Sequence, residues 1–191
     1  LTRMHAAGLL AVERHGRHRY YRLACPHLGT LTELLAQLAP RRPVRSLRGA
    51  RAASGLSLAR TCYDHLAGDI GVAVCESLQT LRVITISDGR VGLGHRHDDL
   101  LTKQLGVDLH AFRGDRRRPD ARLCLDWTAR RHHLAGALGA ALTHRLVELG
   151  WLHRHPSTRA LAITSNGWAG FETYFGITKE QLAEDVIRLP A

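Results

Sequence analysis

The chain has 191 residues, which suits one large domain or two small ones, and 45% of them are hydrophobic, enough for an ordinary core. Aromatic residues make up only 5%, so we expect a core of Leu, Ala and Val, which favours helices. The formal net charge is +10. Such an excess favours a polyanionic partner such as nucleic acid, although an Arg-rich proteome would give the same composition.

The cysteines and the apolar runs indicate the cellular compartment of the protein. Cys25, Cys62, Cys75 and Cys124 are far apart in a chain too long for a small disulfide-stapled fold, and no secretory signal leads it. No apolar run approaches the roughly 18 residues that span a bilayer. We therefore expect reduced thiols in a cytoplasmic protein without a membrane partner. The first residue is leucine, which indicates a fragment or a misplaced start.

No motif of an enzyme is present in the sequence. There is no G-x-S-x-G and no P-loop, and "VGLGHRHDD" lacks the third glycine of a dinucleotide-binding loop. Proximity of Cys, His and Asp could build a thiol nucleophile, but no other catalytic feature accompanies it. We predict that the protein is not an enzyme.

The first 24 residues predict the end of a helix and a basic β-hairpin. Leu1 and Met4 share a helical face, and Gly8 is placed to end that helix. The stretch "LLAVERHGRHRYYRLA" alternates on both sides of Gly16, as hairpin strands do. Its tip is cationic and contains Arg14, His15, Arg17, His18 and Arg19.

A helix and a linker are expected next. "CPHLGTLTELLAQLA" has an uncharged leucine stripe at helical spacing, which faces either the core or another subunit. The stripe consists of Leu28, Leu31, Leu34, Leu35 and Leu38. Residues 40–55 are rich in Pro, Arg and small residues and predict a linker.

The second half contains a repeat. "HLAGDIGVAVCESLQTL" begins at His65 and "HLAGALGAALTHRLVEL" at His133, and they align without a gap on one apolar helical stripe. Small residues at Gly68, Gly71, Gly136 and Gly139 would let another backbone approach closely. In each copy two apolar segments follow as a hairpin, and a short helix closes the unit. This order predicts two winged-helix-like subdomains.

The stretch "HAAGLLAVERHGRHRYYRLA" resembles the recognition-helix end and wing of ArsR-type winged-helix transcriptional regulators. "RTCYDHLAG" and "CLDWTARRHHLAGALGAAL" resemble the C-terminal extension of a subgroup of that family. The resemblance implies a homodimer that binds double-stranded DNA, with the helix after the wing in the dimer contact. It also implies that the N-terminal helices and most of the recognition helix are absent from this chain.

Carried over to this chain, the resemblance names DNA-contacting residues. They are Arg3 and His5 at the end of the recognition helix and Arg14, His15, Arg17, Arg19 and Tyr20 in the wing. Wing arginines would neutralise phosphates, which position a protein on DNA without reading its sequence. The alternative is a solvated Arg-rich turn.

The resulting fold prediction is α+β and mostly helical. We expect the C-terminal part of a winged helix-turn-helix domain with its dimer helix in residues 1–39 and a linker in 40–55. A regulatory domain would fill 56–191, with winged-helix-like repeats at about 56–112 and 120–180.

Two Cys/His clusters lie in the repeats. Cys62, His65, Cys124 and His133 have the donor types of zinc or another transition metal and are a candidate metal site. However, Cys62 precedes its histidine by three residues and Cys124 by nine, so the two cysteines are not equivalent in the repeat. Alternatively, the cysteines are core residues, Asp64 and Asp126 cap helices, and the histidines form hydrogen bonds at a seam between subdomains.

Trp127 and Trp151 flank the second copy. They could line an effector pocket, but large aromatic side chains at helical spacing are more often core, and we expect core here.

The sequence therefore predicts a DNA-binding transcriptional regulator, a homodimeric repressor of the ArsR type. An effector or a redox change at the Cys/His seam would alter the spacing of the two wings. The rival hypotheses are an interaction or dimerisation module without specific DNA binding and a metal- or thiol-responsive sensor.

Overall fold

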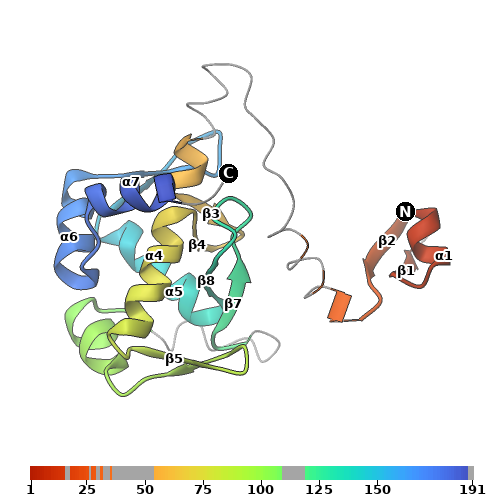
Figure 1. Ribbon diagram of the computed structural model, residues 1–191, viewed down its shortest axis with the longest axis horizontal. Helices are drawn as coiled ribbons and strands as arrows, with labels where there is room; N and C mark the ends of the chain where they lie inside the picture. Colours follow the sequence, from red (N-terminus) through yellow and green to blue (C-terminus); the bar gives the residue numbers. More distant parts are fainter. Residues whose placement is uncertain are drawn as a thin grey trace. The chain divides into compact units, whose positions relative to one another are not determined.

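The computed structural model describes residues 1–15, 18–25, 27–28, 31, 35, 54–108 and 119–188. The chain divides into two compact units, Leu1–Arg41 and Arg42–Ala191, each of which is described by itself (Figure 1). Most of the predicted dimer helix and the linker up to residue 53 lie outside the described residues.

The first unit has a short helix and a hairpin. Helix α1 (Thr2–Ala6) ends before Gly8, whose φ of 72° lies in the left-handed region that follows many helix ends, as predicted. Strands β1 (Leu10–His15) and β2 (His18–Leu23) pair antiparallel, from Leu10 opposite Leu23 to His15 opposite His18. The predicted hairpin is therefore confirmed.

The second unit begins with residues 54–58, which are helical, so the prediction of a linker over 40–55 is wrong for residues 54 and 55. The hairpin β3 (Arg60–Cys62) and β4 (His65–Ala67) follows, and then helix α4 (Asp69–Thr80). A second hairpin, β5 (Ile84–Ser87) and β6 (Arg90–Leu93), leads to the π-helical turn η1 (Asp98–Gln104).

The same order of elements returns after residue 119. Hairpin β7 (Arg122–Leu125) and β8 (His132–Ala135) leads into helix α5 (Gly136–Glu148). Hairpin β9 (Leu152–Arg154) and β10 (Leu161–Ile163) leads into α6 (Ser165–Phe175), and α7 (Lys179–Arg188) closes the chain. The long helix and the following hairpin of each copy were predicted, but the hairpin in front of each helix was not.

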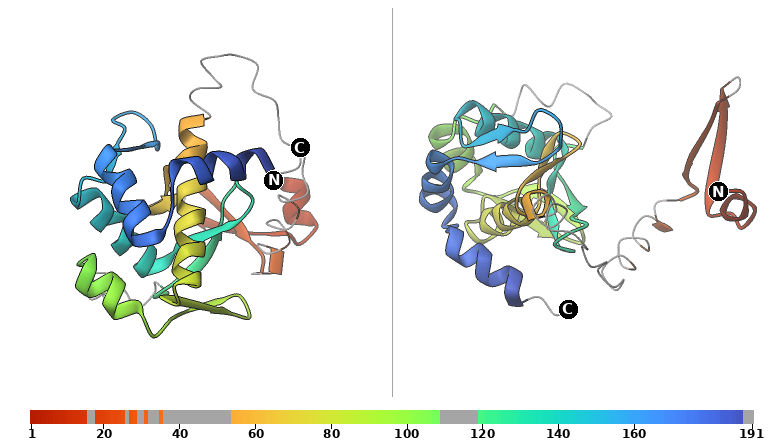
Figure 2. Two further views of the ribbon diagram at one scale, coloured as in Figure 1. Left: turned by 60° about the vertical axis from the view of Figure 1, so that its left-hand side comes forward. Right: turned by 90° about the horizontal axis from the view of Figure 1, so that it is seen from above.

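The two copies pack crosswise. Helix α4 contacts strand β8 of the second copy, and helix α5 contacts strand β4 of the first copy. Figure 2 shows α4 crossed by α7, and these two helices are in contact. The apolar faces of both copies form one shared core, which includes Leu66, Ile70, Leu78, Leu134, Leu138 and Leu146.

The predicted close approaches occur at all four glycines: a Cβ on Gly68 would lie 2.5 Å from the carbonyl oxygen of Ser57, and one on Gly136 would lie 2.7 Å from that of Pro119. A Cβ on Gly71 would lie 2.7 Å from the carbonyl oxygen of Leu66, and one on Gly139 would lie 2.5 Å from that of Leu134. In each copy the missing side chain therefore lets the helix lie directly against strand backbone.

The prediction that both tryptophans are core residues is wrong for Trp127, which is 59% exposed, whereas Trp151 is buried.

Among the described residues, the helices are too short or too polar to cross a bilayer.

Candidate functional site

The candidate metal residues occupy equivalent places in two hairpins. In the first hairpin Cys62 pairs with His65 across the ladder, and in the second Cys124 pairs with His133. The expectation that the two cysteines are not equivalent is therefore wrong. Sequence spacing differs because two residues join the first pair of strands and residues 126–131 join the second.

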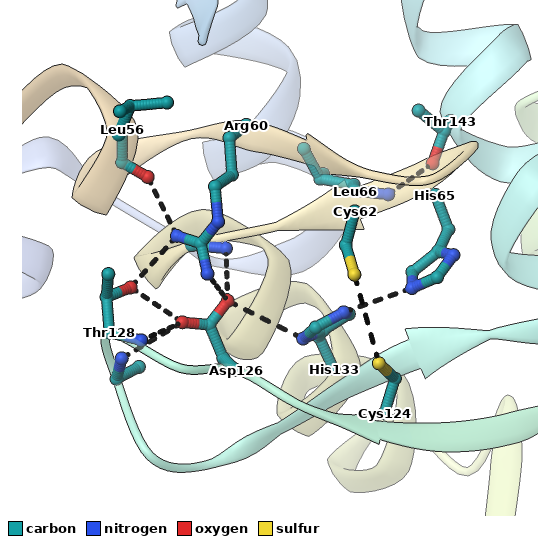
Figure 3. A network of polar contacts seen from close by, with 12 residues as sticks. Leu56, Arg60, Cys62, His65, Leu66, Cys124, Asp126, Thr128, His133 and Thr143 are labelled. Atoms are coloured by element: carbon teal, nitrogen blue, oxygen red, sulfur yellow. Dashed lines mark hydrogen bonds and ion pairs between the residues drawn. The ribbon is translucent and has the colours of Figure 1, made fainter. Parts of the chain in front are cut away.

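The crosswise packing brings the four side chains together. The Sγ atoms of Cys62 and Cys124 lie 4.0 Å apart, and the Nε2 atoms of His65 and His133 lie 3.1 Å apart. One donor atom from each of the four residues lies within 4.8 Å of the others. Figure 3 shows the sulfur atoms facing each other and the rings pointing toward each other. Thus the structure assembles all four predicted donors at one point.

The outer nitrogen of each histidine faces a carboxylate. Nδ1 of His65 lies 3.4 Å from Oδ1 of Asp64, in the turn of its own hairpin. Nδ1 of His133 lies 3.6 Å from Oδ2 of Asp126, in the loop of its own hairpin. Carboxylates behind imidazoles are a common way to fix which nitrogen carries the proton.

Asp126 is the centre of a buried network. Its Oδ2 accepts hydrogen bonds from Nη2 of Arg60 and from the backbone N–H of Gly68, each at 2.7 Å. Its Oδ1 accepts bonds from the hydroxyl and N–H of Thr128 and from the N–H of Ala129. Because Gly68 precedes α4, the carboxylate from the second copy covers the start of the helix in the first.

Arg60 is fully buried and is held from several sides. Besides Asp126, its Nη1 donates to the carbonyl of Leu56 at 2.7 Å and to the hydroxyl of Thr128 at 2.9 Å. The guanidinium carbon lies 4.6 Å from the ring centroid of Trp127. The exposed ring of Trp127 therefore covers the buried guanidinium in a cation–π contact.

Burial and charge set the ionisation of this region. Burial alone would raise the pKa of Asp126, but the hydrogen bonds from Arg60, Thr128 and the backbone outweigh it and hold that pKa well below its usual range. Burial lowers the pKa of His133 to about 4, and His65 and Arg60 add to the decrease while Asp126 opposes it. Near neutral pH, Asp126 is thus charged and His133 neutral.

The cysteines fall into two groups. All four are described, and none of them is in a disulfide. Cys75 is buried in α4, and burial raises the pKa of its thiol to about 12, so the interpretation of a cysteine as a core residue fits this position. Cys25 is exposed in the first unit, whereas Cys62 and Cys124 are half-buried.

The predicted DNA-contacting residues lie in the first unit. Arg3 and His5 are exposed on α1, and Arg19 and Tyr20 are exposed on β2. Arg14 and His15 belong to β1, but their side chains, like the whole of Arg17, lie outside the described residues. Arg22, on β2, forms an exposed ion pair with Glu13 of β1.

Comparison with known proteins gives the class of protein: the chain belongs to the HTH-type transcriptional regulators. It is 41% identical over 177 residues to the uncharacterized HTH-type transcriptional regulator YdfF of Bacillus subtilis (strain 168). The match covers 93% of this chain and 77% of YdfF. No family model and no solved structure matches the chain.

Sequence reasoning missed Arg60 and gave Asp126 too small a role. Arginine is rarely buried unless it is paired, so nothing marked Arg60 as an interior residue. One signal was available: Arg60 and Arg122 each stand two positions before a cluster cysteine. Only the first of them is buried.

Proposed function

We propose that this transcriptional regulator is a homodimeric repressor of the ArsR type that contacts double-stranded DNA through its first unit. The observation that carries this proposal is the basic hairpin β1–β2 directly after a helix, in a chain that belongs to the HTH-type regulators. Residues 1–24 contain one acidic residue, Glu13. Their arginines are Arg3, Arg14, Arg17, Arg19 and Arg22.

The exposed side chains support a role at the phosphate backbone. Arg3 lies on the helix and Arg19 on the hairpin, and both are exposed. Tyr20 is 57% exposed beside Arg19, where a tyrosine can donate to a phosphate oxygen. In a winged helix the helix enters the major groove and the hairpin lies over the backbone or minor groove.

The leucine stripe supports the homodimer. Leu31 and Leu35 are one helical turn apart and are 50% and 56% exposed. Two large apolar side chains on one exposed face favour a second subunit as their partner. Analytical ultracentrifugation tests this: a dimer is expected, and Leu35→Lys should shift it to monomer while Leu93→Lys, an exposed leucine of the second unit, should not.

The DNA proposal is tested by titrating the full chain against a duplex of its own promoter and a scrambled duplex at two salt concentrations. We expect a preference for the promoter and a steep loss of affinity with salt. Arg19→Ala should reduce the slope of log K against log salt by about 0.9, the contribution of one phosphate contact. Arg90→Ala is the matched control, because it removes an exposed arginine of the second unit.

Equal, weak binding to both duplexes would contradict the proposal and favour the rival, an interaction module without specific DNA binding. If Arg19→Ala and Arg90→Ala gave the same slope of log K against log salt, the hairpin would not contact the DNA phosphates through Arg19. A reporter gene behind the same promoter distinguishes repression, our expectation, from activation.

A further inference from the structure

We propose that Cys62, His65, Cys124 and His133 form a tetrahedral site for a thiophilic divalent cation, with zinc as the expected occupant. The site joins the two copies of the second unit, because each copy supplies one cysteine and one histidine. The inference is independent of the proposed DNA contact, which is assigned to the other unit.

The separations between like donors, sulfur to sulfur and nitrogen to nitrogen, fit a tetrahedral ion. With Zn–S bonds of about 2.3 Å and Zn–N bonds of about 2.0–2.1 Å, tetrahedral angles place two sulfurs about 3.8 Å apart and two nitrogens about 3.3 Å apart. The corresponding separations in this protein are 4.0 Å for the Sγ atoms and 3.1 Å for the Nε2 atoms. A disulfide would require the sulfurs to be about 2.05 Å apart.

The orientation of the histidines provides a second, independent argument. Nδ1 of His65 lies 3.4 Å from Oδ1 of Asp64, and Nδ1 of His133 lies 3.6 Å from Oδ2 of Asp126. Both rings thus turn the same nitrogen, Nε2, toward the cluster, and these two atoms lie 3.1 Å apart. Metal-bound histidines commonly have a carboxylate behind the nitrogen that does not bind the ion.

A cation satisfies this arrangement better than a proton. Both rings are buried, His65 at 3% and His133 at 0% exposure, and the buried guanidinium of Arg60 is nearby. A proton on either ring would bring no ligand of its own, whereas a metal ion binds both Nε2 atoms and turns the two neighbouring thiols into thiolate ligands, which balance its charge.

Charge balance favours a dication. Two thiolates and one divalent ion sum to zero, and Asp126 is already neutralised by Arg60 at 2.7 Å. A monovalent ion such as Cu(I) would leave one uncompensated negative charge in a largely buried place, which is costly. Four protein ligands also complete the coordination of zinc, as in structural sites.

The test is metal binding by the full, reduced chain. We expect one equivalent of zinc per chain after dialysis, as measured by mass spectrometry. Co(II) should give the intense visible bands of a tetrahedral ion and a thiolate-to-cobalt charge-transfer band. Cys62→Ser and Cys124→Ser should each lose the bound metal, and the double variant Cys25→Ser/Cys75→Ala, which removes the other two thiols, should keep it.

A wild-type measurement covers the case in which the variants do not fold. Zinc should protect Cys62 and Cys124 from a thiol reagent, and a chelator should restore their reaction. The proposal is overturned by zinc at background level, by an octahedral cobalt spectrum, by binding of Cu(I) without zinc, or by a Cys62–Cys124 disulfide in the presence of zinc. These readouts do not depend on DNA, so they remain informative whatever the DNA titration shows.

Discussion

The two hairpins that hold the thiol–imidazole cluster reach one geometry through different loops. In β3–β4 only Tyr63 and Asp64 join the strands, with Tyr63 in the left-handed region at a φ of 61°. In β7–β8 residues 126–131 join them. The cysteine nevertheless stands opposite the histidine in both ladders. The position across the ladder therefore defines the site, while the distance along the sequence is free to vary.

The hairpins also differ in the carboxylate behind each histidine. Asp64 is 34% exposed, whereas Asp126 is 0% exposed and bound to the buried Arg60. A surface ion pair contributes little because water screens it, but removing one partner of a buried pair leaves an uncompensated charge. Although each carboxylate lies behind a histidine ring, Asp126 should therefore contribute much more to the free energy of unfolding than Asp64.

The largest effect is expected for Asp126→Asn. The variant leaves the guanidinium of Arg60 buried without its anionic partner, which should lower the free energy of unfolding by about 3–5 kcal/mol. Urea unfolding followed by circular dichroism measures it. Asp120→Asn, an exposed carboxylate close by, is the control and should be near neutral. A small cost for Asp126→Asn would mean that water reaches Arg60 in solution.

Gly139→Ala should come next. The new Cβ would lie 2.5 Å from the Leu134 carbonyl oxygen and 3.3 Å from Cβ of His65. Overpacking of this kind costs about 1–3 kcal/mol, and the better helix propensity of alanine offsets up to about 1 kcal/mol. Urea unfolding gives the stability, and competition with a chromophoric chelator gives the zinc affinity.

Gly71→Ala makes this comparison sharper. Its Cβ would meet the Leu66 carbonyl oxygen at 2.7 Å but has no histidine among its nearest contacts. It should therefore lower stability to a similar degree while leaving zinc affinity closer to wild type. Gly55→Ala, where a Cβ has open space, is the neutral control. Equal zinc affinity in the Gly71 and Gly139 variants would contradict the placement of His65 against α5.

Cys75 gives a difference between the helices that arises only at high pH, since α5 has Thr143 at the matching position. Its folded-state pKa is raised from 9.0 to about 12, so the unfolded chain loses this proton first. The contribution to stability is complete below pH 9.0 and falls as the pH rises toward 12. Relative to Cys75→Ala, wild type should lose up to about 1.4 kcal/mol per pH unit in that window. A pH-independent difference in urea unfolding would show that the thiol ionises in the folded protein.

The smallest effect is expected for Asp64→Asn. A partly exposed carboxylate beside a histidine should contribute about 0–1 kcal/mol to stability. The same urea experiment measures it next to Asp126→Asn. If the two variants cost the same, the contrast between the hairpins would be wrong.

Much of this fold could be predicted from the hydrophobic periodicity of the sequence, whereas the site could be predicted only in part. The apolar stripe predicted α4 and α5, and the paired segments predicted β5–β6 and β9–β10, because a helix or hairpin with one apolar face shows its period locally. Strands β3, β4, β7 and β8 have three or four residues each and carry arginine, cysteine and histidine, so they have no such period.

The four donor residues were predicted from their chemistry and from their places in the two copies of the repeat. Their meeting point depends on strand register and on crosswise packing, neither of which is encoded in spacing. The role of Arg60 was not predicted for the same reason, since its partner Asp126 is 66 residues away. Local patterns identify elements, whereas a buried polar network is defined by contacts between elements.

The crosswise packing has a consequence for the order of synthesis. Arg60, Leu66 and Gly68 emerge from the ribosome first, yet their partners Asp126 and Thr143 come 58 to 77 residues later. Until then Arg60 has no anion with which it could be buried, and the start of α4 lacks its carboxylate. Contacts of such long range form late and slow the folding of a nascent chain. The second unit should therefore acquire its stability in one step, when α5 has left the exit tunnel, and a chain that stops before Asp126 should be a substrate for proteases.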